Sequence, residues 1–283
     1  MRFDGYKASL ERGIDPDQVI THLALQNPAG ELVEGRPRFG YEACTSLRDA
    51  GGDRWVDVLH GGTNGVLVEV SGEHSPEVVD LIRQAWPVHA CTRADVCRDI
   101  IEDERGVFDR IAPRLDELVR SHGRVKAKGL IPRVRPEEGA TYTIGSRTSE
   151  TYFRFYQKPE QLLAEGLAHK SMRVFLDRWV RAELEAKPQK DNRLRAATFQ
   201  PHEFFGLSRI ARSVCESILD TDVAKTSVIN YKQLTAKHRQ RRVMLKQWGN
   251  VLLEWQKEQG SWAELGLAQR ELLEELDRER QKG

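Results

Sequence analysis

The short strand-forming segments in the first two hundred residues constrain the fold of this 283-residue chain more than any other feature. Several alternate apolar and polar side chains, as a strand does when one face of its sheet is buried. In the segment TYFRFYQ, Phe153 and Phe155 share one face. The opposite face carries Tyr152, Arg154 and Tyr156. This alternation favours an antiparallel sheet with one apolar and one polar face.

Helix patterns lie between these strand patterns. We expect strands at 54–61, 64–72, 88–100, 129–135, 140–145, 151–157 and 178–187, and helices at 74–86, 106–123 and 159–170. The order is then β-β-α-β-α-β-β-β-α-β, and no internal repeat is visible in the sequence. This order predicts an α+β fold in which an antiparallel-rich central sheet is covered by helices.

The last third of the chain has a different pattern. From about residue 203 it is nearly all helical, and residues 229–259 space their apolar side chains as a helix does. Ser261 and Glu264 form a capping-box pattern at the start of another helix. We therefore predict two domains: an α+β domain over 1–200 and an all-helical C-terminal extension over 201–283, with a binding or accessory role.

The composition fits a soluble globular protein, with 31% charged and 39% hydrophobic residues and a net charge of +1. No apolar run approaches the roughly 18 residues of a membrane helix, and the N-terminus lacks the apolar segment of a signal peptide. The four cysteines show neither a CxxC pair nor disulfide-like spacing. We expect a reduced, cytoplasmic protein that has no membrane partner and no structural zinc site.

Acidic residues interrupt three of the expected strands. They are Glu69, Asp95 with Asp99, and Glu183 with Glu185. A carboxylate in an apolar strand must be solvated, paired or bound to a metal. The simplest explanation is a wet sheet face on which these acids pair with arginines. Because the feature recurs on three strands, a carboxylate site for Mg²⁺ or Mn²⁺ is the alternative.

Tyr156 raises a similar choice. A tyrosine serves as a covalent nucleophile in some enzymes, but its ordinary pKa of about 10 requires help at neutral pH. Arg154, Lys158 and the expected metal are the available sources of that help. The structural alternative is a packing tyrosine whose hydroxyl finds a hydrogen bond.

Motifs around these residues resemble those of the replication initiation factor family, which contains rolling-circle initiators of plasmids and phages and related relaxases of conjugative elements. The resemblance spans about residues 55–190. The matching residues are Glu69, Ser71 and Gly72; Thr92, Arg93, Asp95 and Asp99; Gly145, Arg147 and Ser149; Tyr156 and Lys158; and Arg181, Glu183 and Glu185.

The resemblance implies a nickase and strand transferase that cuts one strand of origin DNA and keeps the 5′ phosphate on Tyr156. Lys158, Arg154 and Arg181 are implied to assist the tyrosine or to bind phosphate. The implied ligands of Mg²⁺ or Mn²⁺ are Glu69, Asp95, Glu183 and Glu185, and the choice between the last two stays open. Implied partners are double- and single-stranded origin DNA, a helicase of the host or the element, and a second copy in a homodimer.

Two basic segments without acids and one turn are candidate DNA contacts, because phosphate binding requires positive charge. The alternative for the basic segments is a solvated surface, and for the turn an ordinary hairpin. The first segment supplies Arg124, Lys126, Lys128, Arg133 and Arg135; the second supplies Lys237, Arg239, Arg241 and Arg242; the turn supplies Ser146, Arg147 and Ser149.

Two other functions compete with the covalent nickase. Asp95 with the run Glu185-Ala186-Lys187 imitates the pattern of metal-dependent nucleases, in which water attacks and no covalent intermediate forms. A non-catalytic regulator that binds origin DNA on the same fold is the second.

Overall fold

The computed structural model describes the chain except for residues 63–64, 124, 131–138, 165, 167–174, 176, 226–250 and 281–283. The chain divides into two compact units, Met1–Val228 and Ile229–Gly283. The first unit extends past the boundary predicted at residue 200, because the helices that follow this position pack into its core. Phe204, Phe205 and Val214 belong to the same buried cluster as the strands.

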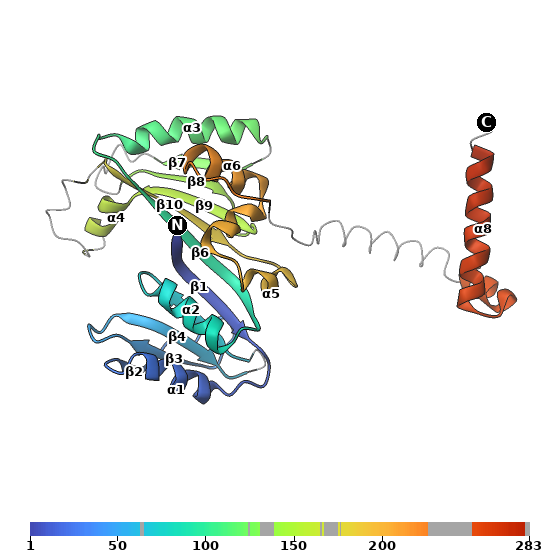
Figure 1. Cartoon of the computed structure of the whole chain (residues 1–283), viewed down its shortest axis with the longest axis horizontal. Helices are drawn as coiled ribbons and strands as arrows, with labels where there is room; N and C mark the ends of the chain where they lie inside the picture. Colours follow the sequence, from blue (N-terminus) through green and yellow to red (C-terminus); the bar gives the residue numbers. More distant parts are fainter. Residues whose placement is uncertain are drawn as a thin grey trace. The chain divides into compact units, whose positions relative to one another are not determined.

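Ten antiparallel strands form one sheet in the described part of the first unit (Figure 1). Their order across the sheet is β2-β3-β4-β5-β1-β6-β10-β9-β8-β7. The strands are β1 (Arg2–Leu10), β2 (Glu31–Glu34), β3 (Ala43–Arg48), β4 (Arg54–His60), β5 (Leu67–Ser71), β6 (His89–Ile101), β7 (Ala127–Leu130), β8 (Thr141–Gly145), β9 (Thr151–Gln157) and β10 (Trp179–Ala186).

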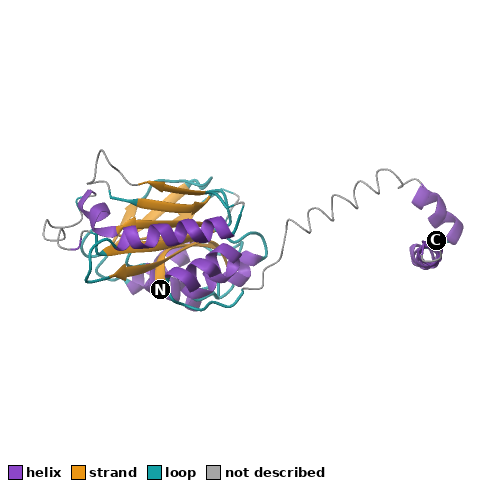
Figure 2. Ribbon diagram, turned by 90° about the horizontal axis from the view of Figure 1, so that it is seen from above, coloured by secondary structure: helices purple, strands orange, loops and turns teal. Residues whose placement is uncertain are grey.

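Helices pack on the apolar face of this sheet, and Figure 2 shows α3 and α6 lying over the strands. The helices are α1 (Pro16–Gln26), α2 (Ser75–Ala85), α3 (Val107–Ser121), α4 (Lys158–Ala164), α5 (Asn192–Ala196), the 3₁₀ helix η3 (Pro201–Leu207) and α6 (Arg209–Ile218). Leu23, Ile82 and Leu115 from three helices share one core cluster with Val68 and Phe155 from the strands. The fold is therefore α+β, as predicted.

The sheet is built from two halves with the same topology. In the first, β1 leads into α1, and β2 to β5 then step from the edge back to β1. In the second, β6 leads into α3, and β7 to β10 step from the opposite edge back to β6. The central strands β1 and β6 pair with each other. Two copies of one supersecondary arrangement thus meet at the middle of the sheet.

The predicted order is confirmed from β4 to β10, including α2, α3 and α4. The sequence did not reveal β1, α1, β2 or β3. In β1 the reason is physical, because irregularities in its pairing with β6 lie between Phe3 and Gly5 and between Lys7 and Ala8. A bulge shifts the side-chain alternation by one residue and so hides the strand pattern.

The second unit is helical where it is described, over residues 251–259 and in α8 (Trp262–Arg280). The predicted cap is confirmed, since the Ser261 hydroxyl accepts a hydrogen bond from the Glu264 amide at 3.1 Å. Residues 229–250 of the predicted preceding helix lie outside the described residues.

None of the helices described is long and apolar enough to cross a membrane. All four cysteines are free and buried.

Candidate active site

The predicted acidic residues and Tyr156 lie on one face of the sheet, opposite the packed core, which we call the polar face. On β9, Phe153 and Phe155 are buried in the core while Arg154 and Tyr156 point the other way. On β10 the same alternation buries Val180, Ala182, Leu184 and Ala186 in the core cluster. Arg181, Glu183 and Glu185 therefore share the polar face.

The hydroxyl of Tyr156 donates a hydrogen bond to Glu183 Oε2 at 3.1 Å. The other oxygen of this carboxylate pairs with Arg154, which stands directly opposite Glu183 on β9. Glu183 is only 5% exposed. Burial, followed by the charge of Glu183, raises the pKa of Tyr156, whereas Arg181 acts to lower it. Neutral tyrosine is therefore the stable form here, with its proton directed at a carboxylate.

Lys158 lies beside the tyrosine ring rather than at its hydroxyl. Its Nζ is 5.7 Å from the ring centroid of Tyr156 and donates to Gln161 Oε1 at 2.9 Å. The two cations predicted to assist Tyr156 therefore lie in different places. Arg154 contacts Glu183, the carboxylate that accepts the hydrogen bond from Tyr156, whereas Lys158 lies beside the ring of Tyr156.

Asp95 and Glu185 form the next layer of the site. They stand opposite each other on β6 and β10, and one guanidinium bridges them: Arg93 Nη2 lies 2.8 Å from Asp95 Oδ2 and 2.9 Å from Glu185 Oε2. Lys187 also pairs with Glu185. Burial raises the pKa of Asp95, and the charges of Glu183 and Glu185 add to this, although Arg93 opposes it. Three carboxylates are therefore close enough to repel one another.

Gly5 on β1 makes room for this layer. It is the residue paired with Asp95, and a Cβ placed on it would come within 2.6 Å of Asp95 Oδ2. The Asp95 carboxylate thus lies over the backbone of β1. Sequence reasoning missed Gly5, although a glycine inside a strand often marks such a close approach.

Arg181 belongs to a neighbouring ion-pair group. Its Nε and Nη2 contact the two oxygens of Asp99 at 2.7 and 2.9 Å, and its Nη1 lies 3.3 Å from Asp4 Oδ1. Trp179 Nε1 donates to Asp99 at 2.8 Å. Burial acts to raise the pKa of Asp99, but the hydrogen bonds from Arg181 and Trp179 outweigh it and hold that pKa below its ordinary value. Arg181 is thus held in place on the strand position opposite Tyr156.

Glu69 is not brought into this group. It lies on β5, which β1 separates from β6, and its contacts are Lys7 Nζ at 2.8 Å and Arg38 Nε at 2.9 Å. Arg38 also reaches Asp57 Oδ2 at 2.5 Å. Asp57 is a further buried acid in an apolar strand, RWVDVLH, so the signal that selected Glu69 was present there too.

The donor set of Asp95, Glu183 and Glu185 suits a hard divalent cation, because it consists of crowded carboxylate oxygens. In this structure Arg93, Arg154 and Lys187 supply the positive charge that these oxygens need. Among the described residues no three His, Cys, Asp or Glu side chains stand in an arrangement that would hold a metal ion. The chemistry fits, and the side chains would have to exchange their cationic partners for the metal.

The predicted DNA contacts are only partly described. Lys126 and Lys128 are exposed at the β7 edge, and Ser146, Arg147 and Ser149 lie in the turn between β8 and β9. Arg124, Arg133, Arg135, Lys237, Arg239, Arg241 and Arg242 lie outside the described residues.

Comparison with known proteins gives a family and similar solved structures. Residues 89–262 match the replication initiation factor family. The structure of a rolling circle replication initiator protein from Geobacillus stearothermophilus is similar at 17% identity and a TM-score of 0.49, covering 80% of this chain and 98% of that one. No curated protein matches the sequence.

Proposed function

Since this chain belongs to the replication initiation factor family, we propose that it starts rolling-circle replication by nicking one strand of origin DNA with Tyr156. The observation that carries the proposal is the 3.1 Å hydrogen bond from the Tyr156 hydroxyl to Glu183. A nucleophile within hydrogen-bond reach of a base is the usual arrangement for covalent catalysis. The enzyme is then a site-specific single-strand endonuclease and strand transferase.

The raised pKa of Tyr156 determines how it is activated. Because little phenolate exists at neutral pH, the proton must leave as the attack proceeds. We assign Glu183 as the base that accepts it. Arg154 pairs with this carboxylate through its other oxygen and orients it.

The reaction is an exchange of phosphodiester bonds. The Tyr156 oxygen bonds to phosphorus, the bond from phosphorus to the 3′ oxygen breaks, and that oxygen leaves with a proton taken from water. The product is a 5′-phosphotyrosine. Rejoining is the reverse: a 3′ hydroxyl attacks the phosphotyrosine and returns its proton to the hydroxide that water left behind, and the tyrosine oxygen leaves and regains a proton from Glu183. No other reactant is consumed.

Arg181 and Lys158 are assigned to the phosphate. Arg181 is held on the strand position opposite Tyr156, and Lys158 lies beside the ring. A guanidinium suits the planar, two-oxygen recognition of a phosphate, while an ammonium acts as a point charge. Both would stabilise the charge that develops at phosphorus.

We further propose that Asp95, Glu183 and Glu185 hold Mg²⁺ or Mn²⁺. Such an ion polarises a scissile phosphate and neutralises developing charge. Burial, with the charges of Glu183 and Glu185 in addition, raises the pKa of Asp95, and a cation at this position would offset both effects. We also propose the partners that the family resemblance implied: double- and single-stranded origin DNA, a helicase and a second copy of the chain. The proposed place of action is the cytoplasm.

The test is Tyr156→Phe with Tyr152→Phe as the matched control. Nicking of a supercoiled plasmid that carries the replication origin, and formation of an SDS-stable protein–DNA adduct, are measured with Mn²⁺. Tyr156→Phe should lower both by about four orders of magnitude or more, as removal of a catalytic nucleophile does elsewhere. Tyr152→Phe should leave both unchanged.

The two competing functions give different results. If Tyr156→Phe still nicks and the wild type forms no adduct, water is the nucleophile and the chain is a hydrolytic nuclease. If the wild type binds the origin but neither nicks nor forms an adduct, it is a regulator without catalytic activity.

A further inference from the structure

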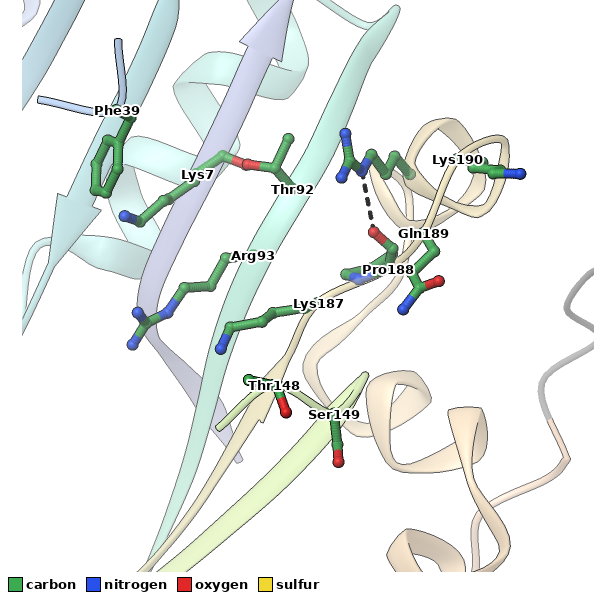
Figure 3. A pocket seen from close by; sticks show the side chains of 11 residues that line it. Lys7, Phe39, Thr92, Arg93, Thr148, Ser149, Lys187, Pro188, Gln189 and Lys190 are labelled. Atoms are coloured by element: carbon green, nitrogen blue, oxygen red, sulfur yellow. Dashed lines mark hydrogen bonds between the residues drawn. The ribbon is translucent and has the colours of Figure 1, made fainter. Parts of the chain in front are cut away.

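A cavity of about 490 Å³ lies beside the carboxylates of the candidate active site. Its walls come from parts of the chain that are far apart in sequence: β1, β6, the loop that carries Phe39, the turn between β8 and β9, and the segment 187–193 that follows β10. Figure 3 shows the side chains of Lys7, Arg93 and Lys187 extending toward the same side, with Phe39 beside Lys7. The volume lies within the range of sites that bind small ligands.

The residues that line this cavity are basic. They include five lysines and arginines and no acid: Lys7, Arg93, Lys187, Lys190 and Arg193. Carboxylates on the polar face pair with three of these: Glu69 with Lys7, and Glu185 of the candidate active site with both Arg93 and Lys187. Arg193 donates to the Pro188 carbonyl at 3.1 Å, which fixes the wall of the cavity. Such a lining attracts anions, and its cations are already held in place.

Phe39 adds an aromatic surface to these charges. It is 56% exposed, and Lys7 Nζ lies 3.8 Å from its ring centroid. Its backbone is left-handed, with φ at 58°. Four non-glycine residues among those described have a positive φ, and two of them, Phe39 and Lys190, line this one cavity. Strained backbone of this kind gathers at ligand-binding sites.

We propose that this cavity binds one unpaired nucleotide of the DNA strand that is nicked, with its base stacked on Phe39 and its phosphate on Arg193 and the neighbouring cations. A charged groove with an aromatic platform is the general means by which proteins hold single strands. A base within a duplex is stacked on both sides, so its face is not accessible to Phe39. The arrangement therefore selects an unpaired strand.

The position of the cavity agrees with this assignment. Lys187, the residue directly after β10, is four residues from Glu183, which is roughly 13 Å on an extended chain. A strand with its scissile phosphate at Tyr156 would therefore pass through the cavity within a few nucleotides. The identity of the bound strand rests on the proposed nicking function, whereas the binding itself does not.

The experiment measures the affinity of the full chain for a labelled oligothymidylate and for a labelled duplex of equal length, in EDTA so that no nicking intervenes. Phe39→Ala should weaken binding of the single strand by about fivefold to 150-fold, the loss of one base–aromatic stack, and leave duplex binding unchanged. Phe39→Trp should retain the affinity, and Phe39→Leu should lose it as Phe39→Ala does.

Arg193 provides the test of the phosphate contact, with Arg195 as its matched control two residues away. Arg193→Gln should reduce the slope of log affinity against log salt by about 0.7, the value for one phosphate contact on a single strand. Arg195→Gln, an exposed arginine that does not line the cavity, should leave the slope unchanged.

Either of two results overturns the proposal: Phe39→Ala binds the single strand as tightly as the wild type, or it weakens single-strand and duplex binding equally. Failure of the nicking function is scored independently, by the adduct that Tyr156 forms. If binding of the single strand depends on Phe39 but no adduct forms, the proposed nucleotide site stands and the proposed nicking function is wrong. If the adduct forms but Phe39→Ala binds the single strand normally, only the proposed nucleotide site is wrong.

Discussion

The two halves of the sheet have the same topology but carry different groups on the polar face. In the first half, Glu69 stands directly opposite Asp57 on the next strand, and Arg38 from a loop contacts both carboxylates. In the second half, Glu183 stands opposite Arg154, with which it pairs. The remaining oxygen of Glu183 accepts a hydrogen bond from the Tyr156 hydroxyl.

The cross-strand neighbour explains this difference. Two carboxylates directly opposite each other repel, so the first half needs a cation between them. Asp57 Oδ2 and both oxygens of Glu69 are used in ion pairs, and Asp57 Oδ1 accepts a hydrogen bond from the Ser46 hydroxyl. A carboxylate opposite an arginine is already neutralised and keeps one oxygen for another partner. The second half also has an opposed pair with a bridging cation, Asp95 and Glu185 with Arg93. What it has in addition, at Glu183, is a phenol beside a base.

We expect the largest difference between the halves when Glu183 and Glu69 are each replaced by glutamine. Glu183→Gln should lower nicking by about 10²- to 10⁴-fold, because the base for the Tyr156 proton is lost. Glu69→Gln, the matched change in the first half, should mainly lower stability, by about 1–3 kcal/mol, since it leaves Lys7 and Arg38 with a weaker partner. Initial nicking rates and thermal unfolding separate the two outcomes.

Equal losses of activity in both variants would break this comparison. They would mean that Glu69 serves the same metal as Asp95, as the family resemblance predicted, and that the division between the halves is not functional.

The contact between Gly5 and Asp95 should give the next largest effect. Gly5→Ala places a methyl group against the Asp95 carboxylate, and overpacking of this kind costs about 1–3 kcal/mol. Because Asp95 must move, the rise in melting temperature that Mn²⁺ produces in the wild type should shrink. Gly266→Ala is the control, since nothing lies within 4 Å of its added methyl. An unchanged response to Mn²⁺ in Gly5→Ala would remove Asp95 from the metal site.

We expect the smallest effect from replacing Asp99, and it should appear in how the free energy of unfolding depends on pH. Its pKa is held below the ordinary value by Arg181 and Trp179 despite burial. The stabilisation is therefore present above an unfolded pKa of about 3.9 and is lost as the pH falls through the folded pKa. Asp99→Asn should lose less stability than the wild type between neutral and acid pH in urea titrations. Parallel curves for the two proteins would show that this group does not couple to folding.

Sequence patterns predicted the strands whose alternation is regular and failed where it is not. In β9 the buried Phe153 and Phe155 alternate with the less buried Arg154 and Tyr156, as the pattern predicts. The irregular pairing of β1 concealed the central strand. The sequence also did not reveal that the sheet has two similar halves, because the similarity lies in the order of the strands and not in a repeated sequence.

At the candidate active site, the sequence identified the acids and the tyrosine more easily than the residues that pair with them. Alternation by twos put Arg154 with Tyr156, and Glu183 with Glu185, on one face of their own strand. Which cation pairs with which acid depends on strand order and register, and no pattern within a single strand contains these. Arg38, Gly5 and Phe39 come from the first 50 residues, where sequence reasoning had no strand to place them on.

The most direct measurement of the central claim is a peptide map of the DNA-linked residue. Trypsin cleaves after Arg154, so Tyr152 and Tyr156 fall on different peptides. After reaction with origin DNA and Mn²⁺, followed by nuclease and trypsin, mass spectrometry should find the added nucleotide on the peptide that begins at Phe155, at Tyr156. A nucleotide on the peptide that ends at Arg154, or on any other residue, would contradict the account.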